Sequence, residues 1–163
     1  MRLQGIVKWL ESNVEEMRKS RQTTLSYLVS SVLSGAHAGV HALGRGLPGK
    51  TLDKHKIKHT YRFLRNEDVE VALVMKSLTQ WAVGNRERVL VLLDWTDMGS
   101  YQQLVASVPM SGRSIPITCV TTFKKGALVR RGTEKELLLQ VAAWVPEGVE
   151  RVVIADLGFD GTA

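Results

Sequence analysis

The chain has 163 residues, of which 44% are hydrophobic and 23% are charged, a composition typical of a folded soluble protein. No stretch of 18 or more apolar residues occurs, which excludes a membrane-spanning helix, and Lys8 and Glu11 interrupt the start, where a secretory signal would be apolar. The single cysteine, Cys119, excludes a disulfide framework and a cysteine-based zinc site, so we expect a reducing, cytoplasmic location.

The formal net charge of +6 is concentrated in one segment. Residues 45 to 65 contain seven lysines and arginines but one acid, Asp53, so this segment alone accounts for the whole net charge. Basic and acidic residues balance in the rest of the chain. A concentrated block of positive charge indicates a polyanionic partner, of which DNA and RNA are the commonest.

Up to Gly84 the chain shows the apolar spacing of amphipathic helices, with an apolar residue every three or four positions. This spacing predicts one helix over residues 3 to 17 and a second that begins after a cap at Thr23. After a glycine-rich passage, two more helices are predicted, over residues 52 to 64 and from Asn66 to Gly84. The last of these is expected to carry Glu67 and Asp68 in its first turn, where acids are favourable.

The helix predicted over residues 52 to 64 has two stripes of different character. Ile57, Tyr61 and Leu64 form an apolar stripe that we expect to pack on a core. The neighbouring stripe is basic, and we expect it to contact the phosphates of double-stranded DNA. Its members are Lys54, Lys58, Arg62 and Arg65.

The pattern changes after residue 85, where short apolar runs replace the helical spacing. Residues 89 to 93 are a continuous apolar run that ends at Asp94, which predicts a strand buried on both faces. The following elements are two strands, then a helix opened by a capping box at Thr133 and running to about Val145, then a last strand. The predicted strands are 101–110, 114–123 and 151–155. The sequence therefore predicts an α/β (α+β) chain: a helical, basic DNA-binding region at 1–85, then a region of order β-β-β-α-β at 86–163.

Asp94 and Asp156 occupy equivalent places, because each is the first polar residue after an apolar strand. Two parallel strands joined by a crossover helix usually lie in one sheet, and neighbouring strands are about 5 Å apart. We therefore expect the two carboxylates to converge at one edge of the sheet. Two close anions are stabilised by a hard divalent cation such as Mg²⁺, which prefers oxygen ligands, and such sites process phosphodiesters.

Three segments together resemble the insertion-sequence transposases of the DDE class. They are Val89–Thr96, the segment Val152–Phe159, and the basic segment Lys54–Asn66. The resemblance spans residues 25 to 160 in order and spacing. It implies an RNase H-like catalytic core preceded by a helical DNA-binding region. In that family the second aspartate stands in the sequence Ala-Asp-Arg-Gly-Phe, and Leu157 replaces the arginine here.

The resemblance also implies the chemistry. Such enzymes use Mg²⁺ or Mn²⁺ to cut the ends of a mobile DNA element and join them to target DNA, which would place this chain with the nucleoid. Asp94 and Asp156 correspond to metal ligands. The family's third ligand is a glutamate well downstream of the second aspartate, and the 163 residues end at Ala163 before it. We therefore expect a truncated, inactive fragment that self-associates or pairs with an intact transposase.

Two alternatives remain open from the sequence. In the first alternative, the chain is a non-catalytic DNA-binding regulator of an intact transposase, and the absence of the third carboxylate discriminates between this alternative and a transposase. The second is a P-loop nucleotide hydrolase, because Gly44–Thr51 has the spacing of a phosphate-binding loop. That loop requires a preceding strand, and the residues before Gly44 do not predict one. His37 with His41 and His55 with His59 have the spacing of metal ligands on a helix, but no cysteine or acid accompanies them.

Overall fold

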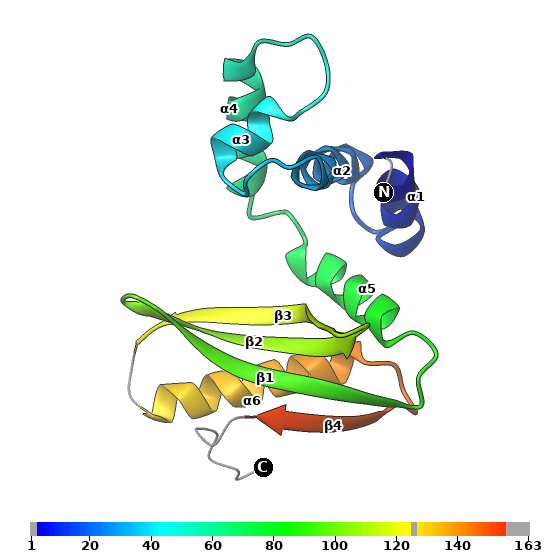
Figure 1. Cartoon of the computed structure of the whole chain (residues 1–163), viewed down its shortest axis with the longest axis vertical. Helices are drawn as coiled ribbons and strands as arrows, with labels where there is room; N and C mark the ends of the chain where they lie inside the picture. The colour runs from blue at the N-terminus through cyan, green and yellow to red at the C-terminus, as the bar shows by residue number, and fades with distance from the viewer. Residues whose placement is uncertain (1–2, 125–126, 156–163) are drawn as a thin grey trace. The chain divides into compact units, whose positions relative to one another are not determined.

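The computed structural model of the chain describes residues 3–124 and 127–155. Within these residues it contains six helices and one mixed four-stranded sheet (Figure 1), which confirms the predicted α/β class. The predicted order β-β-β-α-β of the second region is also confirmed. The elements are α1 (Leu3–Asn13), α2 (Lys19–Leu33), α3 (Val40–Arg45), α4 (Asp53–Leu64), α5 (Val71–Val83), β1 (Arg88–Met98), β2 (Tyr101–Met110), β3 (Arg113–Phe123), α6 (Ala127–Trp144) and β4 (Glu150–Ala155).

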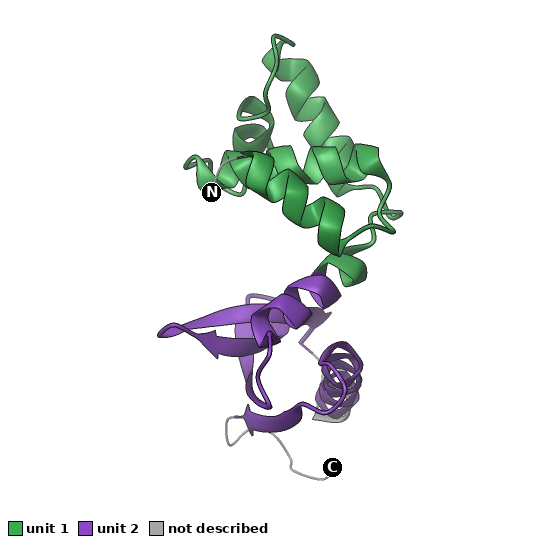
Figure 2. Ribbon diagram, turned by 90° about the vertical axis from the view of Figure 1, so that its right-hand side faces the viewer, with its two compact units in different colours: residues 1–74 green, residues 75–163 purple. Residues whose placement is uncertain are grey.

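The chain forms two compact units that meet inside α5, at Val74 and Met75 (Figure 2). The sequence places the boundary later, after residue 85. The two ends of α5 pack differently: Leu73 and Val74 lie against an N-terminal helical core, and Ala82 and Val83 belong to the core of the sheet. Because both ends of one amphipathic helix carry apolar residues, the sequence pattern alone gives no sign that the helix is shared.

Two small apolar clusters hold the first unit together. Ile6, Leu10, Val14 and Met17 form one, and Leu28, Leu43 and Leu47 form the other. The first helix ends earlier than predicted, at Asn13, although Val14 and Met17 continue its apolar spacing and are almost fully buried. Burial of these side chains is therefore retained while the backbone turns.

The second and fourth predicted helices begin at positions other than those expected. Helix α2 starts at Lys19, so Thr23 is not a cap: it lies inside the helix and its hydroxyl donates to the carbonyl of Lys19 over 2.9 Å. Helix α5 starts at Val71, and residues 66–70 form a turn in which the Asn66 side chain accepts from the backbone N–H of Asp68 over 3.0 Å. Asparagine side chains stabilise such turns in competition with helix, which explains the late start of α5.

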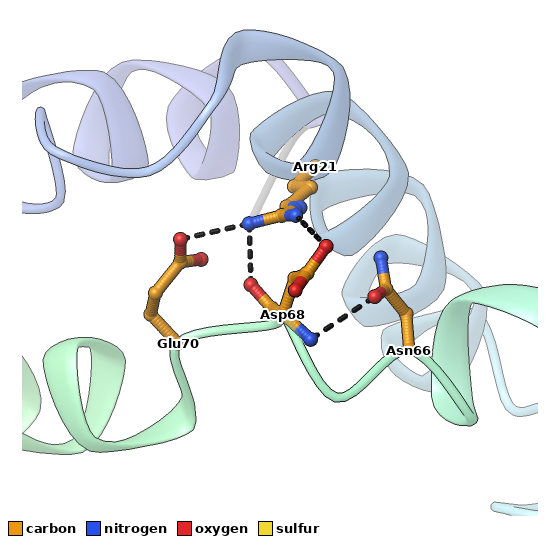
Figure 3. Close-up of polar contacts among 4 residues, drawn as sticks. All are labelled: Arg21, Asn66, Asp68 and Glu70. Atoms are coloured by element: carbon orange, nitrogen blue, oxygen red, sulfur yellow. Dashed lines mark hydrogen bonds and ion pairs between the residues drawn. The ribbon is translucent and has the colours of Figure 1, made fainter.

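The turn between α4 and α5 is fastened to α2 by Arg21 (Figure 3). The Arg21 guanidinium donates to the backbone carbonyl of Asp68, to the Asp68 carboxylate over 3.0 Å and to the Glu70 carboxylate over 2.7 Å. Its side chain is only 11% exposed, so these charge-assisted bonds replace the hydration that burial removes. The pKa of Glu70 is lowered by the hydrogen bond from its own backbone N–H and then by Arg21 and Arg18.

Helix α4 crosses α3 at unusually close range, which requires glycine at position 44. A Cβ atom added to Gly44 would lie 2.6 Å from Cα of Ile57 on α4. The next glycine, Gly46, lies equally close to Ser31 on α2, where a Cβ would overlap the hydroxyl oxygen. The glycine-rich passage is therefore the contact point of three helices.

The sheet of the second unit has the strand order β3-β2-β1-β4. Strands β1, β2 and β3 are antiparallel neighbours, and β4 pairs with β1 in the parallel direction after the crossover helix α6. Helix α6 lies along one face of the sheet, as Figure 1 shows, and its Leu137 and Val141 join the strand residues in one core. The core side of β1 consists of Val89, Val91 and Leu93.

Two-residue turns close both hairpins, and their φ angles explain their residue types. Between the paired residues Met110 and Arg113, Ser111 and Gly112 have φ of +51° and +76°, the positive values that define a type I′ turn. Gly99, which opens the β1–β2 turn, has φ of +63°. The predicted strand 101–110 is confirmed, and the predicted strand 114–123 begins one residue earlier, at Arg113.

Two predictions for the second unit are wrong. Strand β1 does not end at Asp94 but continues to Met98, because β2 pairs with it along that whole length, and its apolar run is buried on one face only, since Leu90 is 39% exposed. Thr133 does not cap α6, which already begins at Ala127. Glu134, of the expected capping box, instead accepts a hydrogen bond from the Trp95 indole over 2.8 Å.

No helix within the described ranges is both long enough and apolar enough to cross a membrane.

The close crossing of α3 and α4 predicts a large effect of one methyl group. Gly44→Ala is expected to destabilise the first unit by about 1–3 kcal/mol, because either the helices separate or the new Cβ overlaps Ile57. Gly132→Ala in α6, where nothing lies within 4 Å of the new atom, is the matched control and is expected to stabilise by about 0.5–1 kcal/mol. Urea unfolding followed by circular dichroism measures both, and equal stability of Gly44→Ala and the unmodified chain would contradict the close crossing.

The Arg21 contacts predict a pH-dependent contribution to stability. Because the folded-state pKa of Glu70 is lowered from 4.5, its contribution is present above that pH and is lost as the pH falls through the lower folded value. Arg21→Met is therefore expected to lower the thermal midpoint at pH 7 and to narrow its difference from the unmodified chain below about pH 4. Arg18→Met, whose charge acts only from a distance, is the control with a smaller effect. A constant difference between Arg21→Met and the unmodified chain from pH 7 to pH 3 would refute this coupling.

Candidate functional site

Helix α4 presents a row of exposed cations, as the sequence predicts. Lys54, Lys58 and Arg62 of α4 are exposed, as is Arg65, which caps the C-terminus of the helix, and together these four residues form the basic face of α4. Their spacing of three to four residues places them along one side of the helix. The acid nearest in sequence is Asp53, at the first turn of the helix, where it complements the helix dipole.

The apolar stripe predicted for α4 is wrong in two of its three members. Tyr61 and Leu64 are 48% and 53% exposed, whereas Thr60 is fully buried and Phe63 packs against the Leu28 cluster. Ile57 is the one member that faces the unit, at the crossing with Gly44. The true buried side is therefore centred on Thr60, which the sequence hides because a threonine gives no apolar signal.

Tyr61 and Arg65 form an ordered pair on the exposed side of α4. Arg65 Nη1 donates to the Tyr61 hydroxyl over 2.8 Å, and the guanidinium carbon lies 5.3 Å from the centre of the Tyr61 ring. The apolar spacing of the sequence predicts Tyr61 in the core, so the pair is not expected, although a spacing of four residues along a helix is the signal that reveals it.

The glycine-rich segment does not have the geometry of a phosphate-binding loop. Residues 40–45 are helix α3, so Gly44 lies inside a helix rather than after a strand, and Lys50 is exposed in the loop that follows. The amides of Gly44 and Gly46 belong to the helix and its end, while their α-carbons face α4 and α2. The segment serves helix packing, which removes the geometric basis of the nucleotide-hydrolase alternative.

Asp94 lies on β1 directly after Leu93, which pairs in the parallel direction with Ala155 of β4. Asp94 itself is exposed and pairs on its other side with Val105 of β2, so its backbone is held in the hairpin. Because strand residues alternate between faces and Leu93 is buried beneath α6, Asp94 lies on the face opposite α6.

Several polar side chains lie on the same face of the sheet as Asp94, and one of them contacts it. The Thr96 hydroxyl donates to an Asp94 carboxylate oxygen over 3.3 Å. Gln103 of β2, which pairs with Thr96, donates to the Thr121 hydroxyl of β3 over 3.1 Å. The result is a row of oxygen-bearing side chains across three strands with a carboxylate at one end, and oxygen atoms are the ligands that Mg²⁺ prefers.

The second predicted ligand, Asp156, lies outside the described residues. Its sequence neighbour Ala155 is the last residue of β4 and is paired with Leu93. The expected neighbourhood of the two strands is therefore confirmed up to Ala155. Over residues 3–124 and 127–155 no group of three or more histidines, cysteines, aspartates or glutamates is placed to hold a metal ion. His59, one of the paired histidines, instead contacts the Thr24 hydroxyl over 3.2 Å.

A polar network on the α6 face of the sheet was not predicted. Arg130 of α6 lies 5.0 Å from the centre of the Trp95 ring and donates through Nε to the side-chain oxygen of Gln102 over 3.1 Å. Trp95 in turn donates to Glu134, which is 7% exposed. These bonds fix α6 against β1 and β2. The sequence signal was misleading, since Glu134 fits a helix cap as well as it fits a buried partner for an indole.

Two separate surfaces of the described residues carry groups that are suited to binding or catalysis. They are the basic face of α4 in the first unit and the carboxylate of Asp94 in the second. Comparison of the chain with protein-family models, curated protein sequences and solved structures finds no match. A functional assignment therefore rests on these residues and their geometry.

Proposed function

We propose that this chain is part of a DNA transposase of the DDE class. In this proposal the first unit binds duplex DNA, and the second unit is the first part of an RNase H-like core whose Asp94 and Asp156 hold a divalent cation. One observation carries the proposal: β1 and β4 are parallel neighbours paired up to Leu93 and Ala155. Asp94 and Asp156 are the residues that follow these two in the sequence.

The connection between those strands supports the proposal. Two carboxylates distant in sequence converge on a sheet when a crossover helix returns the chain to a parallel neighbouring strand. Here α6 is that helix, anchored to the core through Leu137 and Val141. Strand β1 is also held by β2 beyond Asp94, so the carboxylate is on a fixed backbone rather than on a loop.

The donor set around Asp94 suits a hard cation. Asp94 is exposed, and its described polar neighbour on the same strand is the Thr96 hydroxyl, so oxygen donors are available and soft ligands are not involved. A bound Mg²⁺ or Mn²⁺ supplies water activation and charge stabilisation in phosphodiester chemistry. The protein's own part is to place the carboxylates, through β1 and β4, and to bring DNA to them through the basic face of α4.

A second candidate is a DNA-binding regulator without catalysis, which acts on an intact transposase. It is favoured by the basic face of α4, which is fully described and needs no contribution from Asp94. Both candidates require duplex binding by the first unit. Cation binding at Asp94 separates them, because the regulator has no use for a metal.

The basic face of α4 predicts a salt-dependent affinity for duplex DNA of any sequence. Replacing Lys58, Arg62 and Arg65 by Ala is expected to weaken binding and to reduce the log–log salt slope by about 0.9 for each phosphate that is no longer neutralised. Replacing Lys8, Lys76 and Lys135 by Ala removes the same charge from α1, α5 and α6 and is the matched control. Fluorescence anisotropy over a salt series measures both. An equal loss of affinity in the two triple variants would place DNA binding elsewhere.

The Asp94 site predicts cation binding by the full chain. Titration with Mn²⁺, followed by the loss of its free electron-spin resonance signal, is expected to show weak binding that falls by at least about tenfold in Asp94→Asn and Asp156→Asn. Asp97→Asn is the matched control, because Asp97 is on the same strand but its carboxylate is paired with Lys124 over 2.9 Å. Unchanged binding in Asp94→Asn would reject the transposase proposal and leave the regulator.

A further inference from the structure

The cations of the basic face of α4 differ in their contacts with other side chains. Among the described residues no hydrogen bond or ion pair holds Lys58 or Arg62. Arg65, by contrast, is bonded through Nη1 to the Tyr61 hydroxyl at 2.8 Å and stacked on the Tyr61 ring at 5.3 Å. Two exposed side chains four residues apart therefore form one ordered unit on the surface of the helix.

Resting on the proposed function, we propose that Arg65, positioned by Tyr61, reads a guanine base in the major groove of duplex DNA. The remaining cations of the basic face, Lys54, Lys58 and Arg62, contact phosphates. The chain then prefers particular sequences, and Arg65 is the residue that determines one base of that preference.

The place of Arg65 on the helix supports a base contact. At about 100° per residue, the buried Thr60 and the exposed pair of Lys58 and Arg65 lie on opposite sides of α4. A helix that enters the groove with its exposed side therefore carries Arg65 towards the base edges. By the same count Arg62 lies within about 60° of Arg65 on this exposed side, so the bond from Arg65 to Tyr61, and not its place on the helix, distinguishes Arg65 from Arg62.

The chemistry of the pair supports guanine. A guanidinium has five N–H donors, and one bonds Tyr61, so four remain. Two of them can be presented together to O6 and N7 of guanine, the commonest specific contact of arginine in DNA. Ordering a long surface side chain normally costs rotamer entropy, and the bond to Tyr61 meets part of that cost before DNA arrives.

The exposed apolar surface beside the pair fits the same groove. Tyr61 is 48% exposed and Leu64 is 53% exposed, although both are large and lie next to a buried face of the helix. Apolar side chains in the major groove meet thymine methyl groups, whereas a purely phosphate-binding helix has no use for them. Their exposure next to Arg65 therefore points to a surface that meets base edges.

The test begins with selection of duplexes from a randomised library by the full chain at fixed salt. We expect enrichment of a sequence with an essential guanine, bound about tenfold to a hundredfold more tightly than the duplex with adenine there. Replacing that guanine by 7-deazaguanine removes the N7 acceptor alone. It is expected to weaken binding of the unmodified chain and to have a smaller effect on Arg65→Lys, which keeps the charge but has no fork.

Three variants complete the design. Arg65→Lys keeps the charge but has no bidentate fork, so it is expected to lose part of the preference for guanine while binding unselected duplex within about twofold of the unmodified chain. Arg62→Lys makes the same substitution at a cation that is assigned to phosphates. It is the matched control and is expected to keep the preference for guanine. Tyr61→Phe retains the ring and removes the hydroxyl, so it is expected to lose part of the preference without losing affinity for unselected duplex, which a merely structural role would not produce.

The outcomes separate this inference from the proposed function. An undiminished guanine preference in Arg65→Lys, or an equal loss of it in Arg62→Lys, overturns the assignment of Arg65. Duplex binding with no enriched sequence also overturns it, while leaving the proposed function intact. Absence of duplex binding at any salt concentration overturns the proposed function itself. Thermal unfolding of each variant verifies that these exposed substitutions leave the first unit folded.

Discussion

The parallel pairing of β1 with β4 is the constraint on which the second unit depends. Parallel neighbours cannot be joined by a tight turn, so the chain must leave the sheet, cross one face and return. The crossing is possible because α6 buries Leu137 and Val141 on Val89, Val91 and Leu93. If α6 left the sheet, these apolar side chains would be exposed to water at a cost in free energy. Their burial therefore keeps β1 and β4, which are distant in sequence, side by side. The position of Asp94 beside the end of β4 therefore depends on this packing and not on interactions between residues close in sequence.

The first unit depends on a different constraint, the absence of side chains at two glycines. Where Gly44 meets Ile57, α3 and α4 touch through backbone, and this contact sets the orientation of α4; Gly46 lies equally close to the side chain of Ser31 on α2. A helix fixed so closely on one side presents the other side as a rigid surface. The cations of α4 are therefore held at fixed spacing on a frame, and only their side chains adapt. This is the arrangement by which a helix positions charges against a regular polyanion.

Strands β2 and β3 and the turn between them followed from the sequence because alternation and glycine at positive φ are local signals, whereas the end of β1 did not. The hairpin at Ser111 and Gly112 is an example, and so is the end of β3 at Phe123. The predicted starts of two helices were wrong where one side chain could form either of two local hydrogen bonds. Thr23 bonds within its helix instead of capping it, and Asn66 builds a turn instead of a helix start. The position of the exposed cations followed from spacing, but the Tyr61 contact did not, since exposure of a tyrosine depends on the neighbouring helices.

The continuation of β1 past Asp94 has an energetic consequence. A carboxylate on a loop moves away from a like charge, but Asp94 is held by the pairing of β1 with β2 on both sides of it. In the proposed site, Asp94 cannot move away from a second carboxylate without breaking its pairs with β2, so repulsion between the two is a standing cost to the folded state. A divalent cation removes that cost and binds the folded chain only. In that proposal, cation concentration and the unfolding equilibrium of the sheet are thermodynamically linked.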